Sequence, residues 1–323
     1  MGAGNDSFDS ILSTSLSNYR KSLEDNIFGA NPLFYWLYEK KRRKDVDGGE
    51  SIIIPLMYGK NTTVKSYSKY GLLDVTPQEG ITAAKYAWKQ VAGSVAISGL
   101  EERQNSSSAQ IVDLLEAKIL QCEESFREKL DEMAFSDGTG NANQDILGLK
   151  ALIPIDPTTG TVGGINRATV GNEWWRNKYN ATGYTTWGGV SDTAIGAMRK
   201  MYNNCSKGNI HPDLILTTKD VYSLYEGACV LNERFTNTKV ADAGFENIKF
   251  KGATIMFDEY CTAAYMYFLN SKYLNWVVDT QTNFKNTPFQ KPVDQDAKVS
   301  QILLMCELVI SNAARHGILS GMA

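Results

Sequence analysis

The chain has 323 residues, 43% of them hydrophobic and 21% charged, so it can bury a sizeable core and is not a disordered chain. Its 33 Lys and Arg residues nearly balance 36 Asp and Glu residues, and the net charge of −3 excludes the strongly basic composition of many nucleic-acid-binding domains. Two histidines, and five cysteines without a CxxC pair, leave little material for zinc sites, disulfide frameworks or histidine-dependent catalysis.

The first 49 residues are predicted to form an arm. Their start is polar and lacks a signal-peptide core, and no stretch of the chain has the 18 apolar residues of a membrane span. We therefore expect a soluble protein made in the cytoplasm. An apolar cluster at 32–38 precedes the charge run Glu39–Asp45, which includes Arg42 and Arg43. Such a run is typical of a solvated helix end; the alternative is a contact to nucleic acid or to an acidic neighbour.

Two β-type runs follow the arm, at 51–58 and 81–98, with a polar, turn-rich segment between them. We interpret residues 50–99 as one long two-stranded hairpin. A strand of about 18 residues at roughly 3.3 Å per residue spans about 60 Å, whereas a compact chain of this length has a radius of gyration near ~20 Å. Because an isolated ribbon is only marginally stable, we expect the hairpin to lie on another copy of the chain.

The strongest helix prediction covers residues 106–134 and ends at the breaker Gly138-Thr139-Gly140. The apolar side chains recur every three or four residues, at Ile111, Leu115, Ile119, Cys122, Phe126, Leu130 and Met133. The opposite face is predicted to carry Glu116, Glu123, Glu124, Arg127, Glu128 and Asp131. The pattern predicts an amphipathic rod of roughly 42 Å with an acidic outer face.

Helices and strands then alternate irregularly. After a loop-like region at 154–190, the patterns predict helices at 191–204 and from Thr218 through Tyr225, and strands at 212–216, 253–257, 265–275 and 299–312. The fold class is α+β, because the order is mixed and no βαβ repeat occurs.

A search for chemistry predicts no catalytic, metal or cofactor site. The segment from Asp137 resembles a calcium loop, but Ala142 and Gly148 occupy the positions that need Gly and Glu, so we interpret it as a turn. The adjacent carboxylates Glu123/Glu124 and Asp258/Glu259 leave a glycosidase-type pair open.

The histidines and three of the cysteines are given ordinary structural roles. We interpret His211 and His316 as turn residues, and Cys122, Cys229 and Cys306 as packing residues.

Several short strings follow one another along the chain: AFSDGTG at 134–140, VGGINR at 162–167, PDLILT at 212–217, FKGATIMFD at 250–258, YFLN at 267–270 and QDAKVSQI at 295–302. Preceded by an arm, a hairpin and a long helix, this order resembles the tailed-bacteriophage major capsid proteins of the Hong Kong 97 type. The resemblance covers residues 50–319, and it depends on the order of the strings more than on any one of them.

The resemblance implies a domain layout. The N-terminal arm is 1–49, the extended loop 50–99, the peripheral domain 100–149 (with its spine helix) plus 265–310, the axial domain 150–264, and the C-terminal segment that returns to the axial domain 311–323. With only 49 residues before the hairpin, scaffolding is implied to be either a separate protein or a segment already removed.

The implied function is that of a structural protein, not an enzyme: a major capsid protein that self-assembles into an icosahedral shell around a double-stranded DNA phage genome. The implied partners are many copies of itself in hexamers and pentamers, portal and scaffolding proteins, a cement or decoration protein in some shells, and non-specifically packaged DNA, with no membrane and no cofactor. Assembly in the host bacterial cytoplasm and residence in the virion capsid follow. The alternatives are an encapsulin-like compartment shell and, from another class, a carboxylate- or metal-dependent hydrolase.

Nine residues are predicted to make contacts between subunits. The basic run is expected to face the acidic helix of a neighbour, and lysines are expected at the tip of the hairpin. The residues are Arg42, Arg43, Lys60, Lys65, Lys69, Trp88, Glu123, Glu124 and Glu128. Some proteins of the resembled family cross-link through Lys and Asn, but no partner Asn is evident in this sequence, and no cross-link is predicted.

Overall fold

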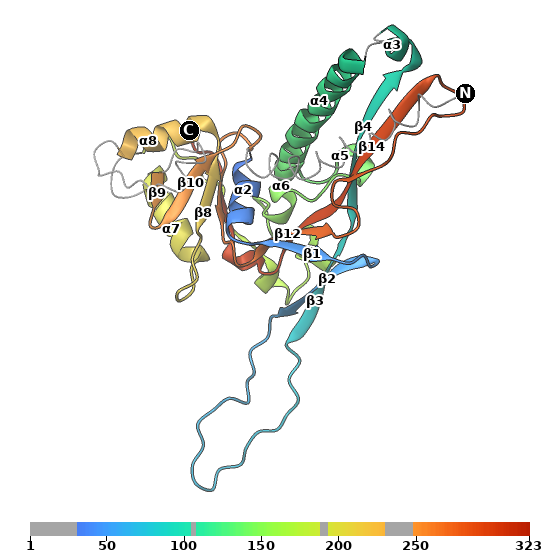
Figure 1. The fold of residues 1–323 in the computed structure, drawn as a ribbon. Coiled ribbons are helices and arrows are strands. Elements are labelled where there is room, and N and C mark those ends of the chain that lie inside the picture. Colours follow the sequence, from blue (N-terminus) through green and yellow to red (C-terminus); the bar gives the residue numbers. More distant parts are fainter. Residues whose placement is uncertain (1–30, 105–107, 188–192, 230–247) are drawn as a thin grey trace.

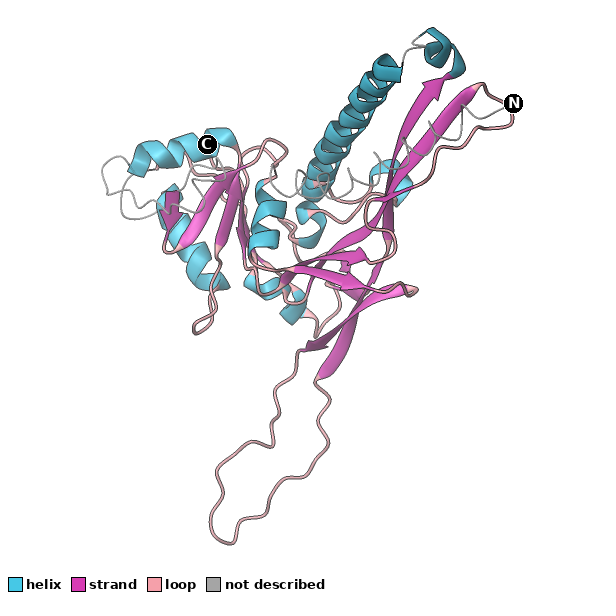
Figure 2. Cartoon of the chain, viewed as in Figure 1, coloured by secondary structure: helices cyan, strands magenta, loops and turns pink. Residues whose placement is uncertain are grey.

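The computed structural model describes residues 31–104, 108–187, 193–229 and 248–323. A body of helices and sheets carries two extensions (Figure 1). One consists of the long helix α4 (Ser108–Phe135) beside strands β4 (Lys89–Ser98) and β14 (Ala297–Ile310). The other is the segment between β2 (Ser51–Met57) and β3 (Ile81–Ala87), which contains neither helix nor strand (Figure 2).

A five-stranded sheet forms the first structural unit. Its strands are β1 (Arg43–Val46), β12 (Leu274–Asp279), β14 and β13 (Lys285–Asn286) in that order, with β4 also paired to β14. In the outer half of β14, buried Ile302 and Leu304 alternate with exposed or half-buried residues, whereas the inner half is buried on both faces. The strand therefore begins as a one-sided surface and ends inside the core.

A six-stranded sheet forms the second unit. Its order is β7 (Lys178–Asn180), β15 (Gly317–Leu319), β11 (Met266–Leu269), β8 (Leu214–Thr217), β10 (Ala253–Phe257) and β9 (Ile248–Phe250). Helices α7 (Ala194–Cys205) and α8 (Lys219–Cys229) cover one face, against Ile215. The other face, with Leu214 and Leu216, packs into the main core. Both faces are covered, which explains the unbroken apolar run of β8.

The remaining elements are short. They are α2 (Pro32–Glu39), α3 (Gly99–Gln104), α5 (Gly140–Asn143), α6 (Leu149–Leu152), β5 (Thr161–Val162), β6 (Ile165–Asn166), η1 (Glu173–Trp175) and η2 (Ala313–Arg315). No helix in the described part of the chain is long and apolar enough to cross a membrane.

The predicted two-stranded hairpin is wrong over residues 89–98, about its last fifth. Strands β2 and β3 pair as expected, from Ser51 opposite Ala87 to Met57 opposite Ile81. Residues 89–98 instead pair with β14 along their whole length. The small residues of this run serve helix packing, because a Cβ on Gly93 would lie 2.7 Å from the Cys122 sulfur of α4.

The predicted strand at 265–275 is two strands in two different sheets. Strand β11 belongs to the six-stranded sheet and β12 to the five-stranded sheet. Between them the Asn270 side-chain oxygen accepts the Lys272 N–H at 3.0 Å, and the Tyr273 N–H donates to the Asn270 carbonyl at 3.1 Å. This Asx-type turn redirects the chain in the middle of a continuous apolar pattern.

The other predicted elements agree with the structure. The helix predicted at 106–134 is α4, and the strand predicted at 253–257 is β10. Helix α7 is capped by Thr193, whose hydroxyl accepts the Gly196 N–H at 3.2 Å; the predicted start at residue 191 lies outside the described residues. Residues 1–30 of the predicted arm also lie outside them, and α2 packs into the main core, with Phe34 edge-on to Trp276 at 4.9 Å.

The isolated histidine and cysteine predictions have mixed outcomes. Cys306 is fully buried and packs as predicted, and Cys122 is half-buried beside β4. The side chain of Cys229 lies outside the described residues. His316 follows the η2 turn and is also fully buried, where it accepts the Asn270 N–H; burial lowers its pKa to about 3.

Candidate assembly interface

The segment 58–80, called the extended loop below, leaves the body at a glycine pair. The Tyr58 N–H donates to the Gly80 carbonyl at 2.9 Å and closes the β2–β3 hairpin. Just beyond, a Cβ on Gly59 would lie 2.8 Å from the Gly80 Cα, which is closer than such atoms approach. The two legs of the loop therefore separate at a point where no side chain fits.

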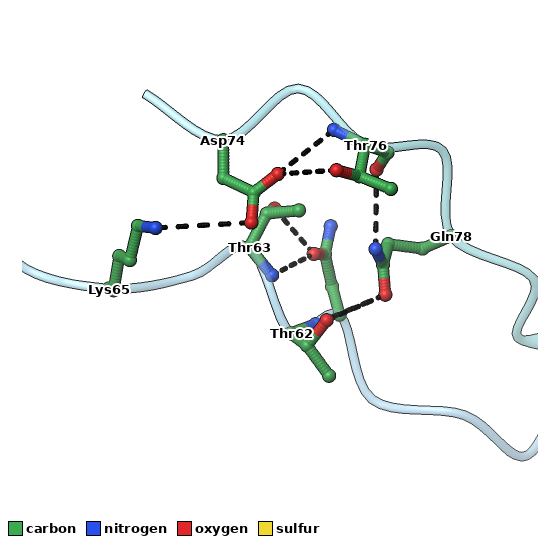
Figure 3. Close-up of polar contacts among 7 residues, drawn as sticks. Thr62, Thr63, Lys65, Asp74, Thr76 and Gln78 are labelled. Carbon is green, nitrogen blue, oxygen red and sulfur yellow. Dashed lines mark hydrogen bonds and ion pairs between the residues drawn. The ribbon is translucent and has the colours of Figure 1, made fainter. Parts of the chain in front are cut away.

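Short polar contacts join the two legs of the extended loop (Figure 3). The Thr62 hydroxyl donates to the Gln78 side-chain oxygen at 2.9 Å, and the Lys65 ammonium lies 3.9 Å from the Asp74 carboxylate. Asp74 also accepts hydrogen bonds from the Thr76 hydroxyl and, at 3.1 Å, from the Thr76 N–H. Both hydrogen bonds lower the pKa of the Asp74 carboxyl. All of these groups face solvent, so they set the local shape of the loop and contribute little to stability.

The extended loop exposes large apolar side chains that nothing in the described chain covers. Tyr70, Leu72 and Val75 are each about 90% exposed, and Val64 is 81% exposed. Burying one such side chain elsewhere is worth about 1.5–3 kcal/mol. These apolar side chains, carried away from the body, make the loop a candidate interaction site.

Aromatic contacts fasten the root of the extended loop to the core. The Tyr58 ring stacks on Trp174 with centroids 5.0 Å apart and planes at 20°, and Trp174 contacts Trp175 at 5.4 Å. Trp175 is fully buried and donates its indole N–H to the Val162 carbonyl at 3.0 Å. The loop is thus anchored at its root, and beyond it the described residues contribute only polar contacts within the loop itself.

Comparisons with known proteins identify the fold. No family model and no curated protein matches the sequence. The capsid of cyanophage A-1(L) is 18% identical, with a TM-score of 0.67 over 86% of this chain and 90% of that chain. The capsid of a native GTA particle is 15% identical, with a TM-score of 0.58 over 89% and 90%. An encapsulin complex from Synechococcus elongatus is 11% identical, with a TM-score of 0.57 over 89% and 87%.

The chain has the Hong Kong 97-type capsid fold. The fold predicted from the order of the sequence strings is thereby confirmed. At these identities the similarity establishes the fold, which phage capsid proteins and an encapsulin share.

Within this capsid fold, the predicted basic contact residues lie on two separate elements. Lys60, Lys65 and Lys69 lie exposed on the extended loop, with the Lys69 ammonium 6.0 Å from the centre of the Tyr70 ring. Arg43 begins β1 and forms an ion pair with Asp45 at 2.9 Å, while Arg42 precedes it.

The acidic face predicted for α4 is only partly exposed. Glu124 is exposed and pairs with Arg127 at 3.3 Å, and Glu128 accepts the Tyr260 hydroxyl at 2.7 Å. Glu123 is buried, and so is Asp131, so the predicted exposure of these two is wrong. Glu123 follows buried Ile119 by four residues, which places it on the packed side of the helix.

Two further observations concern aromatic and apolar residues; the first leaves the predicted Trp88 contact a prediction. Trp88, predicted as a subunit contact, is half-buried at the junction of β3 and β4 and packs against the main core. The exposed apolar residues of the extended loop were absent from the predicted contact set. The signal was present in the sequence as Gly71-Leu72-Leu73-Asp74-Val75, an apolar string inside a polar, turn-rich segment.

Proposed function

We propose that this chain is the major capsid protein of a tailed bacteriophage, which self-assembles into an icosahedral shell around double-stranded DNA. The observation that carries the proposal is the extended loop, whose apolar side chains have no cover in the described part of the chain, on a fold shared with phage capsids. We propose that a neighbouring copy supplies that cover.

In such a shell each subunit contacts several others through different surfaces, and hexamers and pentamers close it by rotational symmetry. Many weak contacts made at once give a stable particle, so no single one needs to be large. The net charge of −3 suits non-specific enclosure of DNA, since a strongly basic wall would bind it tightly. Portal, scaffolding and decoration proteins would be further partners, and assembly would occur in the host cytoplasm before residence in the virion capsid.

We keep the predicted division into arm, extended loop, peripheral domain and axial domain, with two boundaries moved. Because β4 pairs with β14, residues 89–98 go to the peripheral domain. Because β11 pairs with β8 and β15, residues 266–269 go to the axial domain, which the C-terminal strand β15 also joins.

Two alternatives are addressed by observations. The encapsulin from Synechococcus elongatus shares the fold, so a compartment shell is the nearer rival. For the hydrolase, the buried carboxyls that meet are Asp131 and Asp258, which contact each other directly. Paired carboxyls in glycosidases stand about 5 Å or more apart, so a pair close enough to share a hydrogen bond does not fit a glycosidase.

The test is electron microscopy and size-exclusion chromatography of the full chain expressed alone and with its co-encoded proteins. Closed shells or capsomers support the proposal, while a small oligomer with hydrolytic activity would overturn it. Particles that hold a cargo enzyme and no DNA would favour the compartment shell.

A sharper form of the test changes only the surface of the extended loop. Replacing Leu72 and Val75 with Ser should leave the unfolding temperature unchanged and reduce assembly strongly. The matched control replaces Val170 and Val293, which are equally exposed but lie outside the loop, with Ser. Equal loss of assembly in both variants would argue against a specific role for the loop.

A further inference from the structure

Two acidic side chains from distant parts of the chain meet inside the molecule. Asp131 lies in the last third of α4, and Asp258 directly follows β10 of the six-stranded sheet. The two residues are 8% and 3% exposed, line the same cavity, and lie close enough for their carboxyl groups to interact. Helix α4 and the six-stranded sheet are thus joined through a pair of groups that repel each other when both are ionised.

The donors around the pair indicate that a hydrogen bond between the two carboxyls needs a proton from one of them. Asp258 accepts the Tyr260 N–H on Oδ1 at 2.9 Å, and its own N–H donates to the Thr217 carbonyl at 2.9 Å. Neither Asp258 Oδ2 nor Asp131 Oδ1 meets a nitrogen or hydroxyl donor among the described residues. A hydrogen bond between these two carboxyls therefore requires that one of them keep its proton.

Other charged or titratable groups surround the pair on each packed element. On α4 these are Arg127 and Glu128, and on the turn after β10 they are Glu259, Tyr260 and the buried thiol of Cys261. The start of α8 adds Lys219 and Asp220, which line the same cavity of about 700 Å³.

A second acidic contact reinforces the first. The Tyr260 hydroxyl donates to Glu128 at 2.7 Å, one helical turn before Asp131. Helix α4 therefore meets the turn after β10 through this hydrogen bond and through the Asp131–Asp258 pair, and a carboxyl group of α4 takes part in each contact.

We propose that Asp131 and Asp258 form a one-proton latch that holds α4 against the six-stranded sheet, and that loss of this proton releases the contact. The proposal rests on the geometry of a single chain and does not depend on the proposed function, so either can fail alone. The latch would make the contact between the helix and the sheet sensitive to pH.

The direction of the pH effect follows from linkage. Burial raises the pKa of both carboxyls, and the repulsion between them raises that of Asp131 further. The folded chain therefore holds protons that an unfolded chain releases above about pH 4. The latch is most stabilising in acid and is lost as the pH rises through the raised pKa values.

The experiment compares Asp131→Asn and Asp258→Asn with the parent chain across about pH 5 to about pH 9. Either amide can donate to the remaining carboxylate without needing the shared proton. The parent should lose unfolding temperature as the pH rises, and each variant should lose less than half as much. The matched control is Glu132→Gln, which removes an exposed carboxylate next to Asp131 and should follow the parent.

Hydrogen exchange locates the effect. In the parent, protection of residues 128–135 and 258–261 should fall roughly tenfold between the two ends of the pH range, the equivalent of one pKa unit. In both Asn variants it should fall much less. Because the two variants change different elements, failure of one to fold leaves the other as a test.

Two results would overturn the proposal. Equal pH slopes in the parent and both variants would show that no proton is shared. Stabilisation of the parent by millimolar Mg²⁺ or Ca²⁺ at alkaline pH, absent from both variants, would show that a cation and not a proton joins the carboxyls.

Discussion

The extended loop and strand β8 contain similar apolar residues in opposite surroundings. In β8, Leu214, Ile215 and Leu216 are completely buried between two cores. In the loop, Leu72 and Val75 are almost fully exposed, and only surface polar contacts shape the backbone around them. The difference indicates that apolar surface in β8 stabilises the single chain, whereas in the loop no described part of the chain covers it.

The prediction with the largest expected effect tests the extended loop. Deletion of residues 60–76 should abolish shell formation, because it removes the uncovered apolar surface, and should leave the unfolding temperature within experimental error of the parent. Electron microscopy and thermal unfolding of the same preparation measure both. Normal particles from the deleted chain would contradict the proposed role of the loop.

The second prediction tests the buried apolar residues of the six-stranded sheet. Phe268→Ala in β11 removes a completely buried ring and should lower the free energy of unfolding by about 3–5 kcal/mol. The matched change Leu72→Ala on the loop should alter that free energy by less than about 0.5 kcal/mol. Urea unfolding of both variants provides the measurement, and similar losses would mean that the loop packs within its own chain.

A third prediction extends the comparison to polar groups. Glu307 in β14 is completely buried, and one of its oxygens accepts the N–H groups of Leu147 at 2.8 Å and Leu308 at 3.0 Å. Burial raises its pKa to about 8, so its contribution to stability is present in acid and is lost as the pH rises from the ordinary carboxyl range through about 8.

Glu307→Gln should therefore reduce the fall in stability between about pH 5 and about pH 9, as followed by urea unfolding at several pH values. Glu307→Ala should cost about 1–3 kcal/mol, because it leaves the Leu147 N–H without an acceptor. The loop counterpart Asp74→Asn should change neither stability nor its pH dependence, since that carboxylate is exposed. A parent-like pH profile for Glu307→Gln would contradict the assignment.

The smallest effect concerns the basic residues before and in β1. Reversing charge with Arg42→Glu and Arg43→Glu should weaken assembly modestly, and more at low salt than at high salt, if they face an acidic surface of a neighbour such as that of Glu124. Lys207→Glu, far along the chain on an exposed turn, is the control. Assembly that is unchanged at every salt concentration would remove this contact from the proposal.

Local sequence patterns were most informative about where single helices and strands begin and end. The period of three and four residues placed α4 within two residues of its observed bounds, and β10 was predicted with its observed ends. They were least informative about partners. Residues 89–98 have a β-type pattern in any pairing, and only the folded chain shows that β14, some two hundred residues away in sequence, is the neighbour.

The lysines of the extended loop were chosen from the sequence as candidate contacts, and its apolar residues were not selected. These lysines were expected on the loop, and they lie exposed there. The acidic face of α4 was misjudged at Glu123 and Asp131, because helical spacing shows which residues share a side but not how wide a packed surface the neighbouring elements create.

By itself, the sequence determined the long helix, the α+β class, the polar segment with its apolar string, and the ordered strings that resemble phage capsid proteins. These depend on residues near one another in the chain. Only the tertiary structure decided that β11 and β12 belong to different sheets and that β4 pairs with β14. It also brought Asp131 close to Asp258. Each of these depends on which distant segments pack together, and that is settled by the burial of whole surfaces and not by local pattern.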